Sequence, residues 1–255
     1  MNLKSFFLTV VSVSFLFIFT GCFDLDSNAS TGENGVLRYA LYTDYEAAGD
    51  LGTGILPTLV THRISVYSTG AEHLGRYDEI YHVIEPSENA IIISGDNEYS
   101  VPDLTLKVSK SGTYTIVTKN PEKELDRIKL KFETPASLEV VTKVREPYKK
   151  TFVKATGSGT ITTEEGTQIV FIPYFYTSSN VRMIGDIDCE YTADPQWMVV
   201  PDVEWVDETE NSSWTSNYAS SYYLIEEGDV EFTIWHEESG ITGTQKFNVT
   251  AADKD

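Results

Sequence analysis

Three acidic residues at alternate positions, Asp186, Asp188 and Glu190, are the first candidates in this chain for ion chemistry. In an extended strand, residues two apart point to the same face, so the three carboxylates would form one row. Such a row could bind Ca²⁺ if loop carbonyl groups completed the shell. It could equally keep an edge strand from pairing with another chain. We favour the second interpretation and keep the row as the candidate cation site.

The remaining nucleophiles and metal ligands form no catalytic set. No Gly-x-Ser-x-Gly motif occurs in the sequence. Alternation places Cys189 on the same strand face as Ile187 and Tyr191, which predicts a small core residue rather than a reactive thiol. The four histidines lack the spacing of a zinc site: His62, His73, His82 and His236. We therefore expect no catalytic residue, no metal and no cofactor.

A glycan-acting hydrolase of the cell envelope is the alternative from the enzyme class. Its acids would be Asp202, Glu204 and Asp207, which lie around Trp205. Glycoside hydrolysis requires two carboxylates at a defined separation across the sugar. A structure with two carboxylates facing each other across a groove would favour this alternative.

Exposed aromatic residues are the best candidates for binding a partner. Trp214 lies among Asn and Ser residues in a polar loop, with Tyr218 and Tyr222 following it. Aromatic rings in such a setting stack on sugars or anchor protein partners. Alternatively, the Trp214 ring folds back and caps the edge of a β-sandwich. We expect a protein or glycan partner at Trp214, Tyr218 and Tyr222.

The formal net charge of −20 restricts the partners of the chain. Binding to DNA or RNA depends on neutralised phosphates, so we expect no nucleic-acid partner. The same charge argues against docking on an anionic bilayer through a basic patch.

Alternation of apolar and polar residues predicts strands throughout the chain from Val36 onward, as in Leu104–Val108 and Ile128–Phe132. Lys107, Lys129 and Lys131 should face outward. In the first half the expected strands are Val36–Tyr42, Leu59–Tyr67, Ile80–Ile84, Ala90–Ile93, Leu104–Val108, Tyr114–Thr118 and Ile128–Phe132. In the second half they are Leu138–Val144, Thr151–Ala155, Gln168–Tyr176, Met183–Tyr191, Trp197–Val200, Tyr222–Ile225, Val230–Trp235 and Thr244–Thr250.

So many short strands predict an all-β protein with two antiparallel β-sandwiches in tandem, at 36–134 and 135–255. The joint is expected at Thr134-Pro135-Ala136, where proline cannot extend a ladder. A weak internal repeat places a turn glycine, Gly112 or Gly228, before the penultimate strand of each half.

The Gly-x-Tyr sequence at Tyr114 resembles the tyrosine corner of immunoglobulin-like domains. The resemblance implies a Tyr114 hydroxyl bonded back to the preceding loop. The second half has Val230 at this place, and Ile116 and Phe232 stand where antibody domains carry their second cysteine.

Residues 1–21 have the features of an export signal. Lys4 precedes an apolar run of 14 residues, which is short for a bilayer span and typical of a signal peptide. The run ends in Phe19-Thr20-Gly21-Cys22, which resembles the lipobox of bacterial lipoproteins. The resemblance implies cleavage before Cys22 and lipidation of its thiol. An ordinary signal peptide with a chance cysteine, or a retained transmembrane anchor, are the alternatives.

Residues 22–35 are polar and rich in Gly, Ser and Asn, which predicts a flexible tether. Asp24, Asp26 and Asn28 resemble the start of a calcium loop, but Ala29 and Gly35 replace the glycine and glutamate that such a loop requires. We expect a lipid-anchored protein of the cell envelope, in the outer membrane, that acts as a non-catalytic binding, adhesion or structural module.

Overall fold

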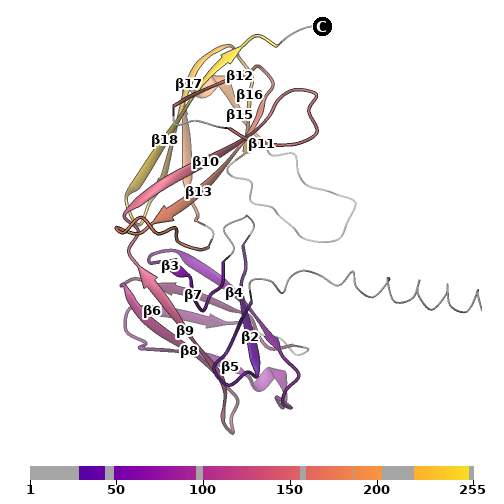
Figure 1. Cartoon of the computed structure of the whole chain (residues 1–255), viewed down its shortest axis with the longest axis vertical. Helices are drawn as coiled ribbons and strands as arrows, with labels where there is room; N and C mark the ends of the chain where they lie inside the picture. The colour runs from indigo at the N-terminus through magenta and orange to yellow at the C-terminus, as the bar shows by residue number, and fades with distance from the viewer. Residues whose placement is uncertain are drawn as a thin grey trace, which may run out of the picture.

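The computed structural model describes residues 29–43, 49–95, 100–155, 159–185, 187–202 and 221–252. In this part of the chain the regular structure is strands, with two short 3-10 helices at Tyr77–Glu79 and Gln196–Met198. No helix there is long and apolar enough to cross a membrane. The chain is therefore an all-β protein, as the sequence predicts (Figure 1).

The first sandwich consists of two sheets that enclose one core. One sheet has the strand order β1-β2-β4-β7-β6, and the other has the order β3-β9-β8-β5. The strands are β1 (Ser30–Thr31), β2 (Leu37–Leu41), β3 (Ile55–Pro57), β4 (Thr61–Ser68), β5 (Tyr81–Glu85), β6 (Ala90–Ser94), β7 (Leu104–Val108), β8 (Gly112–Lys119) and β9 (Glu124–Glu133).

The second sandwich has the same construction. Its sheets have the orders β11-β10-β13-β16-β15 and β12-β18-β17-β14. The strands are β10 (Ser137–Arg145), β11 (Val153–Lys154), β12 (Thr160–Glu164), β13 (Gln168–Tyr176), β14 (Glu190–Asp194), β15 (Val199–Pro201), β16 (Ser221–Leu224), β17 (Gly228–His236) and β18 (Ile241–Thr250).

The two sandwiches repeat one topology, apart from their edge strands: β1 precedes its neighbour β2 in the chain, whereas β11 follows its neighbour β10. The order β2-β4-β7-β6 corresponds to β10-β13-β16-β15, and β3-β9-β8-β5 corresponds to β12-β18-β17-β14. Gly112 and Gly228 begin the equivalent strands β8 and β17, so the weak repeat in the sequence marks a structural one. Each sandwich also has one parallel pair, β3 with β9 and β12 with β18, beside its antiparallel pairs.

Alternation places the apolar residues of the first sandwich in its core. Leu104, Leu106 and Val108 of β7 are buried, and Lys107 between them faces outward, as predicted. The β3 strand was not expected, because three residues are too few for an alternating pattern to be visible.

The corner predicted at Tyr114 is confirmed. Its hydroxyl donates to the carbonyl of Lys110 at 3.0 Å, and its ring contacts Phe132 edge-on with 5.6 Å between the centroids. In the second sandwich, Val230 is buried at the equivalent place in β17. The corner therefore stabilises the loop before β8 only.

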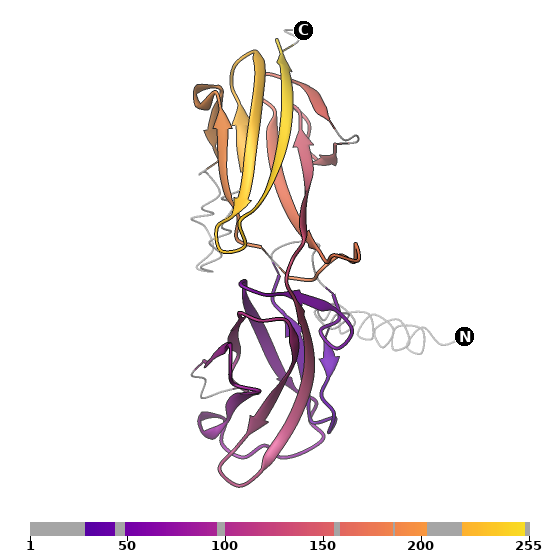
Figure 2. The ribbon, with the colours of Figure 1, turned by 90° about the vertical axis from the view of Figure 1, so that its left-hand side faces the viewer.

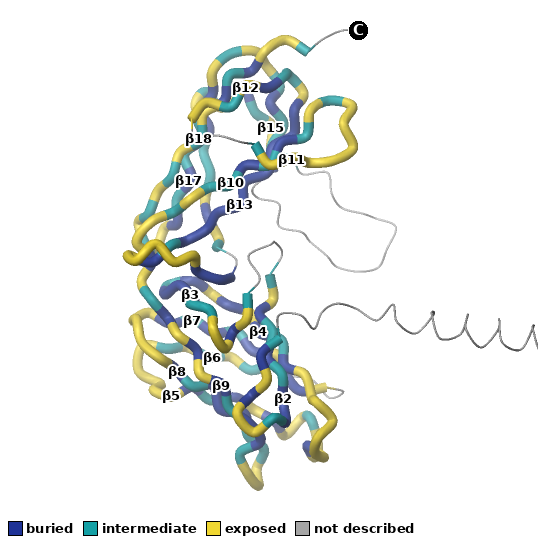
Figure 3. Tube along the Cα trace, viewed as in Figure 1, coloured by how far each residue is buried: buried dark blue, intermediate teal, exposed yellow. Residues whose placement is uncertain are grey.

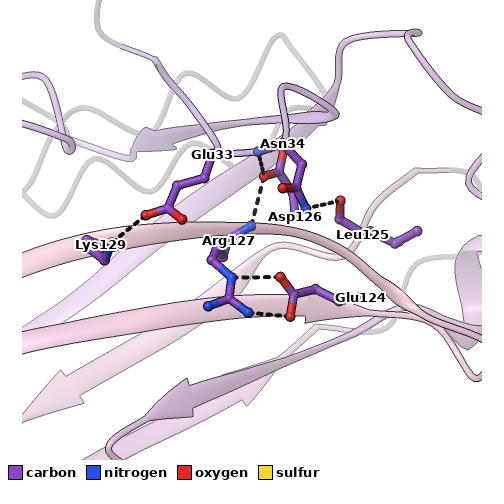
Figure 4. Close-up of polar contacts among 7 residues, drawn as sticks. All are labelled: Glu33, Asn34, Glu124, Leu125, Asp126, Arg127 and Lys129. Carbon is purple, nitrogen blue, oxygen red and sulfur yellow. Dashed lines mark hydrogen bonds and ion pairs between the residues drawn. The ribbon is translucent and has the colours of Figure 1, made fainter.

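The end of the expected tether belongs to the first sandwich, which is a correction. Ser30 and Thr31 pair with β2, and a turn over 32–36 packs against Asp126 of β9 (Figure 4). The buried Asp126 carboxylate accepts backbone N–H bonds from Asn34, Val36, Leu37 and Arg127 at 2.7–2.8 Å. A buried carboxylate needs such donors, and they fix the turn. The folded part of the chain thus begins before Val36.

The core of the second sandwich is aromatic. Phe171 lies 4.9 Å from Phe232 between ring centroids, and Phe247 lies 5.8 Å from Phe232. Cys189 is buried beside this cluster, as predicted, and burial raises its pKa to about 12. Its thiol therefore stays protonated and serves as a small core group.

The sandwiches lie end to end, joined between β9 and β10 (Figures 1 and 2). No described strand of one pairs with a strand of the other. The expected strand Met183–Tyr191 is wrong, because β14 begins only at Glu190. Its first residues serve the joint instead: Ile184 belongs to the core of the first sandwich, and its amide donates to the carbonyl of Ile55 at 2.9 Å.

Candidate functional site

A groove of about 400 Å³ lies where the two sandwiches meet. This volume is within the range of small-molecule sites in proteins. Its lining comes from β4, β7 and the C-terminal end of β2 on one side, and from the start of β14, the end of β17 and the segments that flank them on the other. We describe it as the interdomain groove.

The wall from the first sandwich is basic. Arg63 of β4 and Lys107 of β7 line it, with Thr61 and Tyr42 beside them. The Lys107 ammonium forms an ion pair with the Glu238 carboxylate, so this pair bridges the two sandwiches. An exposed pair of this kind contributes about 1 kcal/mol at most.

The wall from the second sandwich is acidic. It carries Asp188, Glu190, Glu237 and Glu238, together with Ile187. The acidic wall faces basic residues rather than a second set of acids. In the part of the chain that the structure describes, the groove thus lacks two carboxylates on opposite walls, the arrangement that a glycan hydrolase requires.

His62 lies at the base of the basic wall and is fully buried. Burial lowers its pKa to about 4, and its Nε2 lies 3.0 Å from the carbonyl oxygen of Pro57. A neutral imidazole donates through Nε2 in this contact. A Cβ atom at Gly185, whose φ is +106°, would lie 3.1 Å from Nδ1 of His62. The histidine is therefore a structural donor that requires glycine beside it.

His236, at the end of β17, is also held by structural bonds. Its Nδ1 accepts the backbone N–H of Ser239 at 3.2 Å, and its ring contacts Phe175 at 5.4 Å between centroids. Desolvation lowers its pKa. The bond assigns the acceptor role to Nδ1, so His236 stabilises the turn that carries Glu238.

The acidic residues predicted to form one row on a strand do not share a strand in the structure. Asp188 and Glu190 both line the interdomain groove, but Asp188 precedes β14 instead of sharing a strand with Glu190. Asp186 lies outside the described residues. Among the residues that are described, no group of three His, Cys, Asp or Glu side chains is arranged to hold a metal ion.

The aromatic candidates have different positions. Trp214 and Tyr218 lie outside the described residues, as do Cys22, Trp205, Glu204 and Asp207. Tyr222 of β16 is half-buried and packs on the core, with 5.2 Å between its ring centroid and that of Phe232. Burial raises its pKa. Tyr222 thus extends the aromatic core.

Asp202, the one described acid of the hydrolase alternative, is a structural acceptor. Its Oδ2 accepts hydrogen bonds from the Ser221 hydroxyl at 3.2 Å and from the side chain of Gln168. It therefore ties the end of β15 to β13 and β16.

The sequence did not indicate the other groove residues, Arg63, Lys107, His236, Glu237 and Glu238. They come from distant segments and meet only because the sandwiches join end to end. A second feature was visible in the sequence: residues 143–154 contain five of the chain's 19 basic residues and one acid.

No protein-family model matches the chain, and no curated protein matches it. Solved structures of surface proteins resemble it at low identity. Domains 4–9 of the surface layer protein SbsC are 16% identical, with a TM-score of 0.29, over 89% of this chain and 32% of that chain. The chain thus spans about a third of that surface layer fragment.

Two adhesins show a similar degree of resemblance. FdeC, a broadly conserved adhesin of Escherichia coli, is 11% identical over 88% of this chain and 66% of that chain, with a TM-score of 0.29. The adhesin InvE of Yersinia pseudotuberculosis is 10% identical over 86% and 61% of the two chains, with a TM-score of 0.28. The function proposed below is argued from this chain's own residues.

Proposed function

We propose that this chain is a lipid-anchored, non-catalytic module of the cell envelope, whose paired sandwiches present a binding surface at the membrane. The observation that carries the proposal is the packed joint. Ile184 enters the core of the first sandwich, while Met183 packs with Val60 and Phe175 in a separate cluster at the joint. Such a joint holds two sandwiches as one elongated unit.

The described histidine and cysteine side chains that could take part in catalysis have structural roles instead. His82 bonds Thr118 through Nδ1 at 2.8 Å and the Pro102 carbonyl through Nε2 at 2.7 Å. Its pKa is lowered, chiefly by burial. His62 and Cys189 are buried in the same manner. These groups are neutral and committed to the fold, so they are unavailable for acid–base or nucleophilic catalysis.

The proposed anchor is the thiol of Cys22, in the outer membrane. Because the folded part begins by Ser30, only residues 22–28 separate the lipid from the first sandwich. Seven residues span about 25 Å at full extension. The first sandwich would then lie close to the bilayer, and the second would present loops for a protein or glycan partner, including the loop of Trp214.

The anchor is tested by protease treatment of intact cells, with the native protein beside a Cys22→Ala variant. We expect the native protein in the membrane fraction and the variant in the soluble fraction. Cleavage of the native protein on whole cells would support a surface-exposed binding role. Resistance until the outer membrane is opened would direct the search to a periplasmic partner.

Incorporation of a radioactive fatty acid provides the direct readout of lipidation. A Cys189→Ala variant is the matched control. It should keep the label, because the native Cys189 thiol is buried and should not be lipidated. Equal membrane association of native protein and Cys22→Ala variant, without label, would contradict the anchor. A separate Trp214→Ala variant that retained every partner interaction would exclude the Trp214 loop as the binding site.

A further inference from the structure

Residues 143–154 form a basic hairpin in a chain that is otherwise strongly acidic. β10 and β11 pair at its base, and a loop of residues 146–152 connects them. The segment holds Lys143, Arg145, Lys149, Lys150 and Lys154 against Glu146, so its net charge is +4 in a chain of −20. The net charge conceals this local reversal of sign.

The hairpin differs from the other basic sites in its partners. Seven lysines and arginines elsewhere are paired with acids, as in Lys129 with Glu33 at 2.7 Å and Arg127 with Glu124 at 2.6 Å. Lys149, Lys150 and Lys154 are exposed, and no ion pair of theirs occurs within the described residues. Acidic side chains are about twice as numerous as basic ones in this chain, so these three lysines lack acidic partners in the described part of the chain although acids are plentiful.

The pairing register adds to the positive charge at the base of the hairpin. Lys143 lies directly opposite Lys154 across the two strands. Like charges at directly opposed positions lower the stability of a sheet.

Aromatic and apolar side chains accompany these charges. Tyr148, at the tip, is 99% exposed, and Val153 is 58% exposed. Phe152 is partly exposed, and the Arg145 guanidinium lies 5.0 Å from its ring centroid. Basic side chains around an exposed tyrosine suit the interface between water and a bilayer, where the ring enters the headgroup layer.

The hairpin lies far from the joint between the sandwiches. β10 begins at Ser137 beside the joint and extends for nine residues to Arg145, about 30 Å at the rise of a strand. The connection between β10 and β11 is exposed and projects from the second sandwich (Figures 1 and 3). The neighbouring turn, which brings Gly166 next to Pro147, carries Glu164 and Glu165, and counting both leaves a net charge of +2.

We propose that this hairpin docks the second sandwich on an anionic phospholipid bilayer. Lys149 and Lys150 contact the lipid phosphates, and Tyr148 enters the headgroup layer. The acidic remainder of the chain is repelled by such a surface, so the hairpin alone would approach it and would fix the orientation of the second sandwich. The proposal does not depend on lipidation of Cys22.

A bilayer explains the exposed apolar groups better than a soluble polyanion does. Phosphate charge alone would account for the lysines, whereas Tyr148 and Val153 gain free energy only where apolar surface leaves water. A bilayer offers both interactions in one layer.

The test is co-flotation of the full chain with vesicles of phosphatidylglycerol and phosphatidylcholine, compared with vesicles of phosphatidylcholine alone. Each lysine near an anionic surface contributes about fivefold to binding, so a Lys149→Gln/Lys150→Gln variant should partition about 30-fold less to the anionic vesicles. A Tyr148→Ser variant should also bind several-fold less. Residues 1–21 are common to all variants and to both vesicle types, so each variant is scored by its change in binding between anionic and neutral vesicles.

The matched control is Lys129→Gln/Lys131→Gln, which makes the same charge change on β9 and should bind as the native chain does. A Lys149→Arg/Lys150→Arg variant should bind as the native chain does, and unchanged thermal unfolding should show that each variant is folded. Vesicles should also protect Lys149 and Lys150, but not Lys123, from a water-soluble acetylating reagent.

Equal losses in the two lysine pairs would overturn the proposal, because net charge alone would then govern binding. Equal affinity for both vesicle types would overturn it as well. Binding to soluble polyphosphate that is as strong as vesicle binding, with no loss on Tyr148→Ser, would assign the hairpin to a soluble polyanion instead. None of these outcomes depends on the fate of the Cys22→Ala variant, so the two proposals fail separately.

Discussion

The backbone amide of Ile184, in the second half of the chain, donates to the carbonyl of Ile55 in the first at 2.9 Å. The side chain of Ile184 lies against Gly49 and Gly54, where a Cβ atom on either glycine would collide with it. A loop of the second sandwich thus extends the core of the first. The joint is a packed contact, rather than a linker between independent domains.

Substituting Ile184 by Ala should destabilise the first sandwich by about 3 kcal/mol, because a buried isoleucine is lost and a cavity remains. Denaturant unfolding followed by tryptophan and tyrosine fluorescence measures the change. Ile91→Ala is the matched control: that side chain is 63% exposed on β6, so its loss should cost less than about 0.5 kcal/mol. Equal effects would show that the Ile184 contact contributes little.

Gly185→Ala should destabilise the joint for two reasons that a control can separate. The residue has φ +106°, and its new Cβ would lie 3.1 Å from Nδ1 of His62. Gly70 has φ +77° with open space around it, so Gly70→Ala incurs the backbone cost of about 1 kcal/mol alone. A larger loss at Gly185, read from thermal unfolding, would measure the contact with His62. Equal losses would contradict a close fit between the sandwiches.

Asp126→Asn should cost about 3 kcal/mol of stability. The amide nitrogen of an asparagine would face backbone N–H groups that now donate to the carboxylate, and buried donors without acceptors are costly. Asp229→Asn, at an exposed site bonded to Asn248, should have little effect. Limited proteolysis should then cut the Asp126→Asn variant near residue 33 faster than native protein. Unchanged cleavage would show that other contacts hold the turn.

Stability should fall as the pH drops from about 6.5 to 4. Burial lowers the pKa of His62 from 6.5 to about 4, so the unfolded chain binds a proton in this range and the folded chain does not. This contribution to the free energy of unfolding is fully present above pH 6.5. Its loss by about pH 4 lowers the stability by about 3 kcal/mol. The lowered pKa of His82 acts in the same direction.

A His62→Gln variant should show a shallower decrease in unfolding free energy over this pH range, whatever its stability at neutral pH. His73→Gln, at an exposed residue, is the control and should keep the native slope. Identical slopes for native protein and His62→Gln would show that protonation of His62 is not coupled to unfolding.

The sequence predicted the elements whose partners lie within the same sheet. Leu104–Val108 and Gln168–Tyr176 have the predicted bounds, because alternation or a continuous apolar run is a local signal. The expected strand Met183–Tyr191 failed because Ile184 is apolar for another reason, namely its contact with the other sandwich. A pattern of buried residues does not identify the element that buries them.

The interdomain groove could not be predicted from the sequence. Arg63 and Glu238 are far apart in the chain and meet only through the orientation of two sandwiches. The basic hairpin is the opposite case, since Lys149 and Lys150 are adjacent in the sequence. The net charge of −20 averages them with distant acids, so it describes the chain as a whole and carries no information about the hairpin.

The backbone hydrogen bonds to the Asp126 carboxylate also affect how the fold resists mechanical force. Tension applied at the N-terminal end first meets the two-residue strand β1 on β2, which can peel away while the core stays intact. The load then passes to the backbone groups held by Asp126 across to β9, far along the sequence. A force on the N-terminal end would therefore detach a few residues and lengthen the chain there before the sandwich itself unfolds. The bonds to Asp126 limit this extension.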